Sequence, residues 1–275
     1  MNLPKPSSYL NMSLPRLQRH DADQWLHLGD LILHLTRRNF LLRYKGSALG
    51  ILWSLLVPLS QLLVLVFVFG KVVPLNIEAY PAFVFSAILP WNWFSNCLGA
   101  AGSLFIGNRD LVRKPDFEPA TLVIVDVLVN FLLYLVFLPI LLAILIAYGR
   151  PITCSILALP LIMVIQALLT ISLALIVATL NVFYRDIQYI VTVSLMLLFY
   201  LTPVFYAADH LAGIYRLVLG INPVGVLIHH YRAVLFFGQM PQWHTLFGVG
   251  TFSIFLCWIA FRLYHRCLPE MIDIL

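Results

Sequence analysis

Six long apolar runs set the pattern of the sequence, and short polar stretches separate them. Each run holds about 20 residues or more, which is the length that an α-helix needs to cross a bilayer core. A Lys or Arg at the centre of such a helix costs about 2.5 to 3.5 kcal/mol on insertion, so long uncharged runs indicate spans. The pattern predicts an all-α integral membrane protein with six transmembrane helices, at residues 46–70, 81–106, 121–147, 152–183, 187–206 and 244–261.

A further apolar stretch, residues 217–237, is broken by polar residues and by helix breakers. We interpret it as part of a re-entrant outer segment, residues 207–243, because backbone that is not helical survives at membrane depth only where protein or a water-filled cavity covers it. Such a segment suggests the mouth of a pore. The alternative, a seventh span, moves the C-terminus to the other side and buries two histidines and an arginine in lipid. The interrupting residues are Gly220, Asn222, Pro223, Gly225, His229, His230 and Arg232.

The N-terminal region, residues 1–45, predicts a helix that lies on the membrane surface. Asp21 and Asp23 suit a helix start, and apolar residues then recur on one helical face, as in an interfacial helix. The alternative is a polar leader that happens to be helical. The apolar face consists of Trp25, Leu28, Ile32 and Leu35.

Composition and charge support this reading and orient it. The chain has 61% hydrophobic and 11% charged residues, which excludes an ordinary soluble domain with its roughly 25% charged residues. With six spans and a cytoplasmic N-terminus, 13 of the 17 Lys and Arg residues lie in the cytoplasm, as the positive-inside rule requires. The excess of positive charge therefore indicates cytoplasmic loops and lipid head groups, and no nucleic acid is expected. We predict one transmembrane domain at 46–262 and a cytoplasmic tail at 263–275.

The sequence contains no motif for chemistry of its own. It has no phosphate-binding loop, no dinucleotide fingerprint and no zinc-protease motif, and its four cysteines lack metal or disulfide spacing. We expect no enzyme activity and no cofactor on this chain, so that any use of ATP comes from another protein.

The loop between the second and third runs, residues 107–119, combines both signs of charge at high density. A solvated loop near the cytoplasmic membrane surface explains the basic residues, whereas a docking surface for a charged soluble partner explains both signs. Its charged residues are Arg109, Asp110, Arg113, Lys114, Asp116 and Glu118.

Two further positions carry charge close to the spans. Asp126 lies about a turn and a half inside the third run, and an acid in a span suggests function; the structural alternative is a pair with Arg113, Lys114 or Arg185. Arg185 and Asp186 form the whole loop before the fifth run and are interpreted as an interfacial pair.

Aromatic residues occur inside the runs as well as at their ends. Phe131, Tyr134 and Phe137 fall on one helical face, and Phe199 and Tyr200 lie toward the outer end of the fifth run. The ordinary explanation is the aromatic belt at the membrane surface. The alternative is a channel lining along which flat sugar rings slide.

Five stretches together resemble one family, the type-2 ABC exporter permeases that move lipid-linked polysaccharides such as O-antigen, capsule and teichoic acid. The most specific stretch runs NFLLRYKGSALGILWSLLVP, in which the matching residues are Arg43, Tyr44, Lys45, Ser47, Leu49, Gly50, Trp53 and Pro58. The others, in chain order, are GNRDLVRKPDFEP, FYRDIQYIV, LTPVFY and INPVGVLIHHYRAVLF.

The resemblance implies an assembly of two permeases and two ATPase subunits in a bacterial inner membrane, with ATP and Mg on the ATPase. It implies an interface helix at 24–40, a gate and coupling helix at 108–117 that includes Asn108, and outer gating helices at 211–237 that include Asn222, Pro223, His229 and His230. The substrate is then a polyprenyl-diphosphate-linked glycan. Arg37, Arg38, Arg43 and Lys45 attract its phosphates on this reading, although ordinary positive-inside anchoring also explains these four residues.

Three competing functions remain at this point. An exporter of a drug or a lipid shares the six spans, but is not expected to have the RYKGSALG and NPV stretches. A membrane glycosyltransferase or phosphotransferase needs clustered acids, commonly with a metal. A secondary transporter needs an internal repeat and paired charges at the membrane midplane.

Overall fold

The computed structural model describes residues 17–43, 45–46, 50, 52–115, 117–207 and 220–275, with side chains from residue 29 onward. The described residues are helical and contain no strand, which confirms the all-α prediction. Asp116, together with Tyr44, Ser47 and Leu49 of the RYKGSALG stretch, lies outside the described residues.

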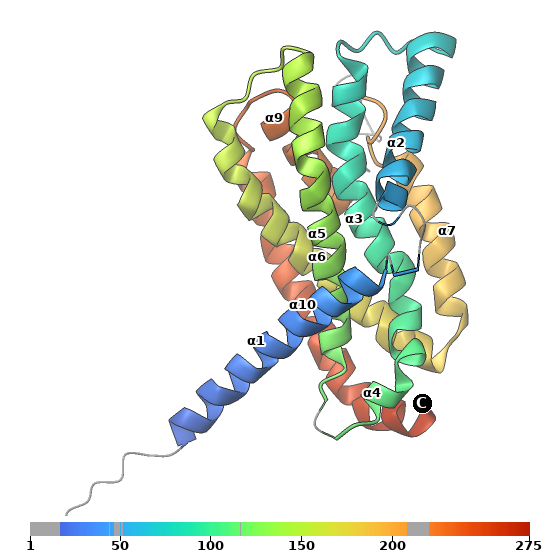
Figure 1. Cartoon of the computed structure of the whole chain (residues 1–275), viewed down its shortest axis with the longest axis vertical. Coiled ribbons are helices and arrows are strands. Elements are labelled where there is room, and N and C mark those ends of the chain that lie inside the picture. Colours follow the sequence, from blue (N-terminus) through green and yellow to red (C-terminus); the bar gives the residue numbers. More distant parts are fainter. Residues whose placement is uncertain (1–16, 44, 47–49, 51, 116, 208–219) are drawn as a thin grey trace, which may run out of the picture.

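The chain forms an upright bundle from which one helix projects at an angle (Figure 1). The projecting helix is α1 (Leu17–Leu42). The helices of the bundle are α2 (Leu52–Phe67, continued by a π-helical turn at Val68–Val72), α3 (Tyr80–Gly107), α4 (Arg109–Val112), α5 (Ala120–Ala147), α6 (Leu159–Phe183, preceded by a 3-10 turn at Cys154–Ala158), α7 (Asp186–Leu201), α9 (Pro223–Leu235) and α10 (Trp243–Ile274). We refer to its two ends as the α4 end, which also holds the C-terminus, and the α9 end.

Four described helices are long and apolar enough to cross a membrane: Leu52–Val72, Ala120–Ala147, Cys154–Phe183 and Trp243–Ile274. The other two predicted spans correspond to α3 and α7. Helix α3 has 28 residues but includes polar side chains such as Asn92 and Asn96, and most of its surface is covered by other helices. Helix α7 has 16 residues, about 24 Å at 1.5 Å per residue, compared with a bilayer core of about 30 Å.

The end of α7 differs from the predicted run, which extended to residue 206. The helix stops at Leu201, and Thr202 adopts an extended backbone with ψ of 137°. Pro203 follows directly, and a residue before proline is disfavoured in the helical region because the proline ring collides with its backbone. Helix α10, by contrast, is longer than the predicted run and continues through Ile274. The residues predicted as a tail, 263–275, therefore prolong the last helix.

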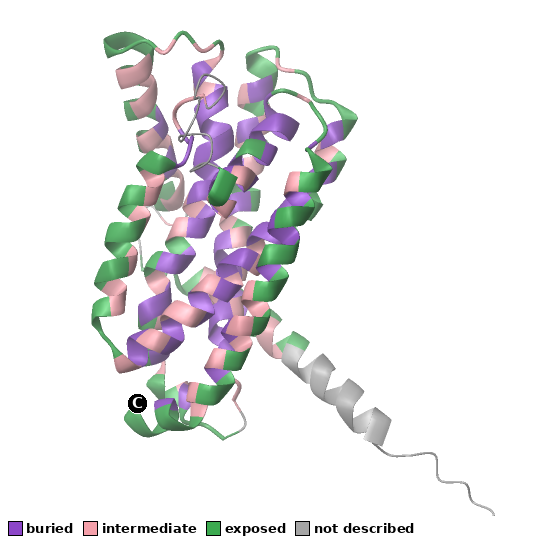
Figure 2. Ribbon diagram, turned by 180° about the vertical axis from the view of Figure 1, so that it is seen from behind, coloured by how far each residue is buried: buried purple, intermediate pink, exposed green. Residues whose placement is uncertain are grey.

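Helix α3 is the centre of the bundle. It packs against α5, α6, α7, α9 and α2, and Figure 2 shows the buried residues concentrated inside the bundle while the outer helix faces remain exposed. In α2, by contrast, the apolar side chains are largely exposed, as a lipid-facing helix requires. The core of the protein therefore lies around α3.

Helix α1 is attached to the bundle by a small separate cluster. Leu35 packs with Val125 and Val129 of α5, and Leu31 and Ile32 cover the contact. Ile32 and Leu35 of the predicted apolar face of α1 are therefore in contact with α5, in addition to any contact that this face makes with the membrane surface. Leu33, Leu41 and Leu42 of α1 are exposed.

At the α9 end, polar bonds hold the segment after α7 to the bundle. The Asn222 side chain caps α9 by accepting from the backbone N–H groups of Val224 and Gly225 at 3.1 and 3.2 Å, and it donates to the Thr202 hydroxyl at 2.8 Å. The buried Arg232 of α9 donates to the Val204 carbonyl at 2.8 Å. Two segments some 20 to 30 residues apart in the chain are therefore one polar unit.

Replacing Asn222 with Ala removes the α9 cap and the bond to Thr202. Loss of a helix cap costs about 0.5 to 2 kcal/mol, so we expect the thermal unfolding midpoint of the purified protein to fall by roughly 2–8 °C. Asn222→Asp keeps an oxygen that accepts from the two N–H groups and should retain most of the stability. Equal midpoints for wild type and Asn222→Ala would contradict this role.

Candidate functional site

The loop at the α4 end is anchored by an apolar residue and presents charge to its surroundings. Helix α3 ends at Gly107, and the Asn108 side chain donates to the Leu104 carbonyl at 2.8 Å. The single turn α4 then buries Val112, which is 1% exposed. The side chains of Arg109, Asp110, Arg113 and Lys114 are exposed around it.

Among the described residues, the exposed charges of this loop have no ionic partner. The ion pair found there joins Arg150 to Glu78 at 3.3 Å and lies at the opposite end of the bundle. Three basic residues and one acid therefore face outward, with a positive balance. An unpaired charged surface on a short rigid turn is suited to bind a complementary protein surface, because charge complementarity selects the partner and speeds association. Of the other two acids in the predicted set, Asp116 is among the residues not described, and Glu118 is bonded within the chain.

Glu118 supports the loop from inside. Tyr264 of α10 is fully buried and donates its hydroxyl to Glu118 Oε1 at 2.5 Å, and its ring lies 6.2 Å from that of Phe105. Glu118, one of the charged residues of the predicted docking loop, is therefore partly covered and bonded within the chain. This bond ties the end of the loop to the last helix at Tyr264, a residue that the sequence prediction placed in the cytoplasmic tail, 263–275.

The junction between α6 and α7 is joined to α3 by side-chain amides. Asn181 donates to the Gly102 carbonyl at 2.8 Å, and Gln188 donates to the Gly99 carbonyl at 2.7 Å. A Cβ at position 102 would displace the amide end of the Gln188 side chain, so the bond from Gln188 to Gly99 depends on the small residue there. Arg185 and Asp186, the predicted interfacial pair, lie at the same junction with both side chains exposed; their role stays a prediction.

Asp126 does not pair with the expected cations, and that prediction is wrong. Asn130 of the same helix donates to Asp126 Oδ2 at 3.2 Å and accepts from Arg43 at 3.1 Å. The residues that follow α1 pass close to α5, so the cation that reaches this region comes from position 43 and not from the α4 loop. Asp126 therefore orients Asn130, and Asn130 in turn accepts a hydrogen bond from Arg43.

The other basic residues near Arg43 are spread over the surface. Arg37 and Arg38 are exposed on α1, where Arg38 donates to the neighbouring Asn39, and Lys45 is exposed just after Arg43. The structure brings Arg43 to the bundle and leaves the other three outside it. Attraction of phosphates by these four residues stays a prediction.

The aromatic residues proposed for a channel have different surroundings. Tyr134 and Phe137 are buried, at 2% and 5% exposure, and the Tyr134 ring lies 5.6 Å from Trp93 and 6.0 Å from Tyr231. Phe131 also packs on Trp93, with ring centroids 5.0 Å apart. Burial of these rings in the bundle rules out the membrane-surface belt for Tyr134 and Phe137.

The two aromatic residues of α7 that are predicted to line a channel have different surroundings. Phe199 lies against Trp91 and Phe205, whereas Tyr200 points outward and is 61% exposed. A role for Phe199 and Tyr200 in a channel between two chains stays a prediction.

The predicted outer gate residues lie on α9. Asn222 and Pro223 begin the helix, His229 is exposed, and the buried His230 lies 3.0 Å from the Thr245 hydroxyl. Helix α9 has 13 residues and is too short to cross a membrane. Burial, together with the neighbouring His229 and His244, lowers the pKa of His230 to about 4, so its imidazole is neutral at physiological pH. Its contact with Thr245 is therefore a neutral hydrogen bond between α9 and α10.

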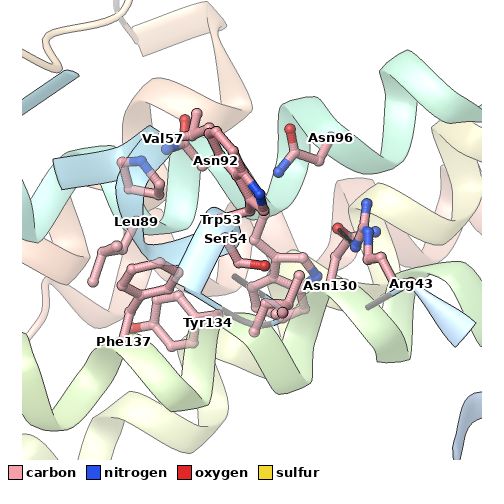
Figure 3. Close-up of a pocket in the computed structure, with 14 residues that line it drawn as sticks. Arg43, Trp53, Ser54, Val57, Leu89, Asn92, Asn96, Asn130, Tyr134 and Phe137 are labelled. Atoms are coloured by element: carbon pink, nitrogen blue, oxygen red, sulfur yellow. Dashed lines mark hydrogen bonds between the residues drawn. The ribbon is translucent and has the colours of Figure 1, made fainter. Parts of the chain in front are cut away.

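A cavity that sequence reasoning missed lies between α2, α3 and α5 (Figure 3). Its volume is about 420 Å³, and Arg43, Asn92, Asn96 and Asn130 supply polar groups to its lining. The sequence does place three asparagines, Asn92, Asn96 and Asn130, inside apolar runs, but nothing in it shows that they meet around one space. Among the described residues, no three His, Cys, Asp or Glu side chains gather in a group that could hold a metal.

Comparison with known proteins gives one family and several relatives. The family described as "ABC-2 type transporter" matches residues 30–236. The chain is 34% identical over 245 residues to the O-antigen export system permease protein RfbA of Myxococcus xanthus, covering 88% of this chain and 94% of the relative. It is 30% identical over 215 residues to the protein of the same name from Klebsiella pneumoniae, covering 78% and 83%.

Replacing Tyr264 with Phe tests the support of the α4 loop. The ring stays against Phe105 but the bond to Glu118 is lost, and a hydrogen bond to a charged group contributes about 1.5–3 kcal/mol. We expect the loop to open more often, so that trypsin cleaves after Arg109 or Arg113 at least about tenfold faster. Tyr184→Phe is the matched control, because Tyr184 is 67% exposed. Equal cleavage rates in Tyr264→Phe and wild type would exclude a supporting role.

Proposed function

Because this chain belongs to the ABC-2 type transporter family, we propose that it is the permease of a bacterial exporter that moves an O-antigen-like, lipid-linked polysaccharide across the inner membrane. The observation that carries the proposal is the 34% identity to an O-antigen export permease over 88% of the chain. An exporter of a drug or a lipid is not favoured, since relatives named for O-antigen export align over most of the chain. The chain itself is a transport component, not an enzyme.

The working assembly contains two copies of this chain and two ATPase subunits, with ATP and Mg bound by the ATPase. The exposed charges of the α4 loop, including Arg109, Arg113 and Lys114, support a docking role. Closure of the ATPase pair on ATP then pushes on this loop. Since the loop connects α3 directly to α5 and is bonded to α10 through Tyr264 and Glu118, the push reaches three long helices together.

The topology of the proposal has six spans, α2, α3, α5, α6, α7 and α10, with α9 re-entrant from the outer side. The α4 end is cytoplasmic, so both termini are cytoplasmic. The excess of Lys and Arg in the segments at this end supports the orientation, and the length of α9 supports the re-entrant assignment.

The proposed substrate is a glycan on a polyprenyl diphosphate. The exposed Arg37, Arg38 and Lys45, with Arg43 beside them, surround the cytoplasmic surface where the diphosphate arrives, and arginine suits phosphate because it offers two parallel N–H donors. The channel between the two copies then carries the glycan outward without altering it. Asn222, Pro223, His229 and His230 lie at the outer exit.

Reversal of charge on the α4 loop tests the function. We expect Arg113→Glu combined with Lys114→Glu to weaken co-purification with the ATPase by about tenfold or more, because like charges then face each other. Polysaccharide on the surface of cells that depend on this chain should fall in parallel. Lys71→Glu is the control, since Lys71 is exposed at the α9 end. Normal assembly and normal surface polysaccharide in the double variant would overturn the docking proposal.

Native cysteines test the orientation. Cys154 is exposed at the α9 end, and Cys267 lies on α10 toward the α4 end. In variants that keep one cysteine each, a maleimide that cannot cross membranes should label Cys154 in spheroplasts, whereas Cys267 should react only after the membrane is broken. The opposite pattern would place both termini outside.

A further inference from the structure

The cavity between α2, α3 and α5 has two chemically different ends (Figure 3). Polar groups gather at one end, around Arg43, Asn96 and Asn130, and apolar groups at the other. The apolar lining consists of Val57, Pro58, Leu89, Leu133 and Phe137, with the ring of Tyr134. A molecule that fills this space must itself be polar at one end and apolar at the other.

The polar end is built around a positioned arginine. Asn130 uses its amide group to donate to Asp126, both to the backbone oxygen at 2.9 Å and to Oδ2 at 3.2 Å, so its own oxygen faces Arg43 and accepts from it at 3.1 Å. A guanidinium has five N–H donors, and this bond employs one. Asp126 and Asn130 thus hold Arg43 at the cavity and leave further donors of Arg43 for a bound group.

Asn96 faces the same space from α3 (Figure 3). It has no side-chain hydrogen bond within the described part of the protein, unlike Asn92, which donates to Gln61 at 3.3 Å. Asn130 lies ten residues into α5, about 15 Å along the helix at 1.5 Å per residue. The polar groups therefore extend toward the middle of the membrane, where polar groups without partners are costly.

The opening of the cavity lies beside α2, at residues that the rest of the described chain leaves exposed. Trp53 and Val57 of α2 line it and are 55% and 65% exposed. Most of α2 is uncovered by the rest of the chain, with 11% of its most apolar stretch buried. An indole at such a position suits the boundary between head groups and hydrocarbon. A ligand therefore reaches the cavity from the bilayer.

We propose that this cavity binds one membrane lipid by its phosphate ester. Arg43 holds the phosphate, Asn96 bonds a neighbouring ester or hydroxyl oxygen, and the first part of a hydrocarbon chain lies between Val57 and Leu133 and reaches Phe137. A volume of about 420 Å³ falls within the roughly 300–1,000 Å³ range of small-molecule sites and excludes a whole oligosaccharide. Two lipids share this chemistry, an anionic phospholipid and a phosphorylated polyprenol.

The site and a phospholipid in it stand on the geometry of one chain, whereas a polyprenyl phosphate in the same site rests on the proposed function, which places Arg43 near the diphosphate of the carrier. The proposed orientation adds that the lipid belongs to the cytoplasmic leaflet, since Arg43 lies toward that side. The lipid then occupies a groove inside each permease, separate from a passage between two copies.

Native mass spectrometry of the purified protein tests the site with four probes: phosphatidylglycerol, a short-chain polyprenyl phosphate, phosphatidylcholine and glycerol phosphate. We expect an anionic lipid with a tail to bind with a 1:1 ratio, and glycerol phosphate, which lacks a tail, to bind far more weakly. Preference for phosphatidylglycerol identifies a phospholipid site, and preference for polyprenyl phosphate identifies a carrier site. Equal binding of phosphatidylcholine and phosphatidylglycerol, or of glycerol phosphate and the lipids, overturns the proposal.

Variants separate this site from general attraction of anionic lipids. Arg43→Gln should weaken binding of the preferred lipid by about tenfold, the effect of losing a charge-assisted hydrogen bond, and Asn96→Leu by several fold. Arg266→Gln removes the same charge from an exposed position of α10 and should have no effect. Since Asn96 is exposed and makes no side-chain bond with the described residues, its substitution spares the fold. Unchanged binding in Arg43→Gln and Asn96→Leu, or an equal loss in Arg266→Gln, rules the site out, whatever the outcome of the ATPase co-purification.

Discussion

The requirement that polar groups inside an apolar bundle find partners governs this structure. Helix α3 lies at the centre, and amides on neighbouring helices bond to its backbone: Gln166 to the Pro90 carbonyl at 2.8 Å, Asn181 to Gly102 and Gln188 to Gly99. In lipid there is no water to replace such bonds, and the hydrophobic effect gives little reason for helices to associate, because lipid tails are as apolar as the helix surfaces. The amide bonds therefore fix which helices meet α3 and at what height.

The same requirement connects the two ends of the protein. At the α9 end, Arg232 lies 3.6 Å above the Phe83 ring of α3 while it donates to Val204. At the α4 end, Tyr264 reaches Glu118 directly before α5 begins. Helix α3 runs between these two points without interruption. A single helix, which contains Pro90, thus links the charged loop to the segment at the far end.

The sequence predicted most of the helices because long uncharged runs leave few alternatives, and helices α3 and α5 start and end within a residue or so of the predicted runs. The sequence did not predict the features that depend on bonds between residues far apart in the chain. Asp126 and Asn130 are neighbours on one helix face at i and i+4, but nothing local to them reveals that Arg43 comes to Asn130. Glu118 likewise resembles any other loop acid in the sequence, because its partner Tyr264 is 146 residues away. The cavity was missed for the same reason, since Asn96 and Asn130 belong to different helices and become a site only when these pack together.

Helix α1 has a geometry with a mechanical consequence. It is 26 residues long, about 39 Å, but its described packing on the bundle is concentrated near one end, where Leu35 meets Val125 and Val129. This contact joins the described part of α1 to α5 as one packed unit (Figure 1). A rotation of α5 about its axis therefore turns this part of α1 with it, so the direction in which α1 leaves the bundle is set by α5.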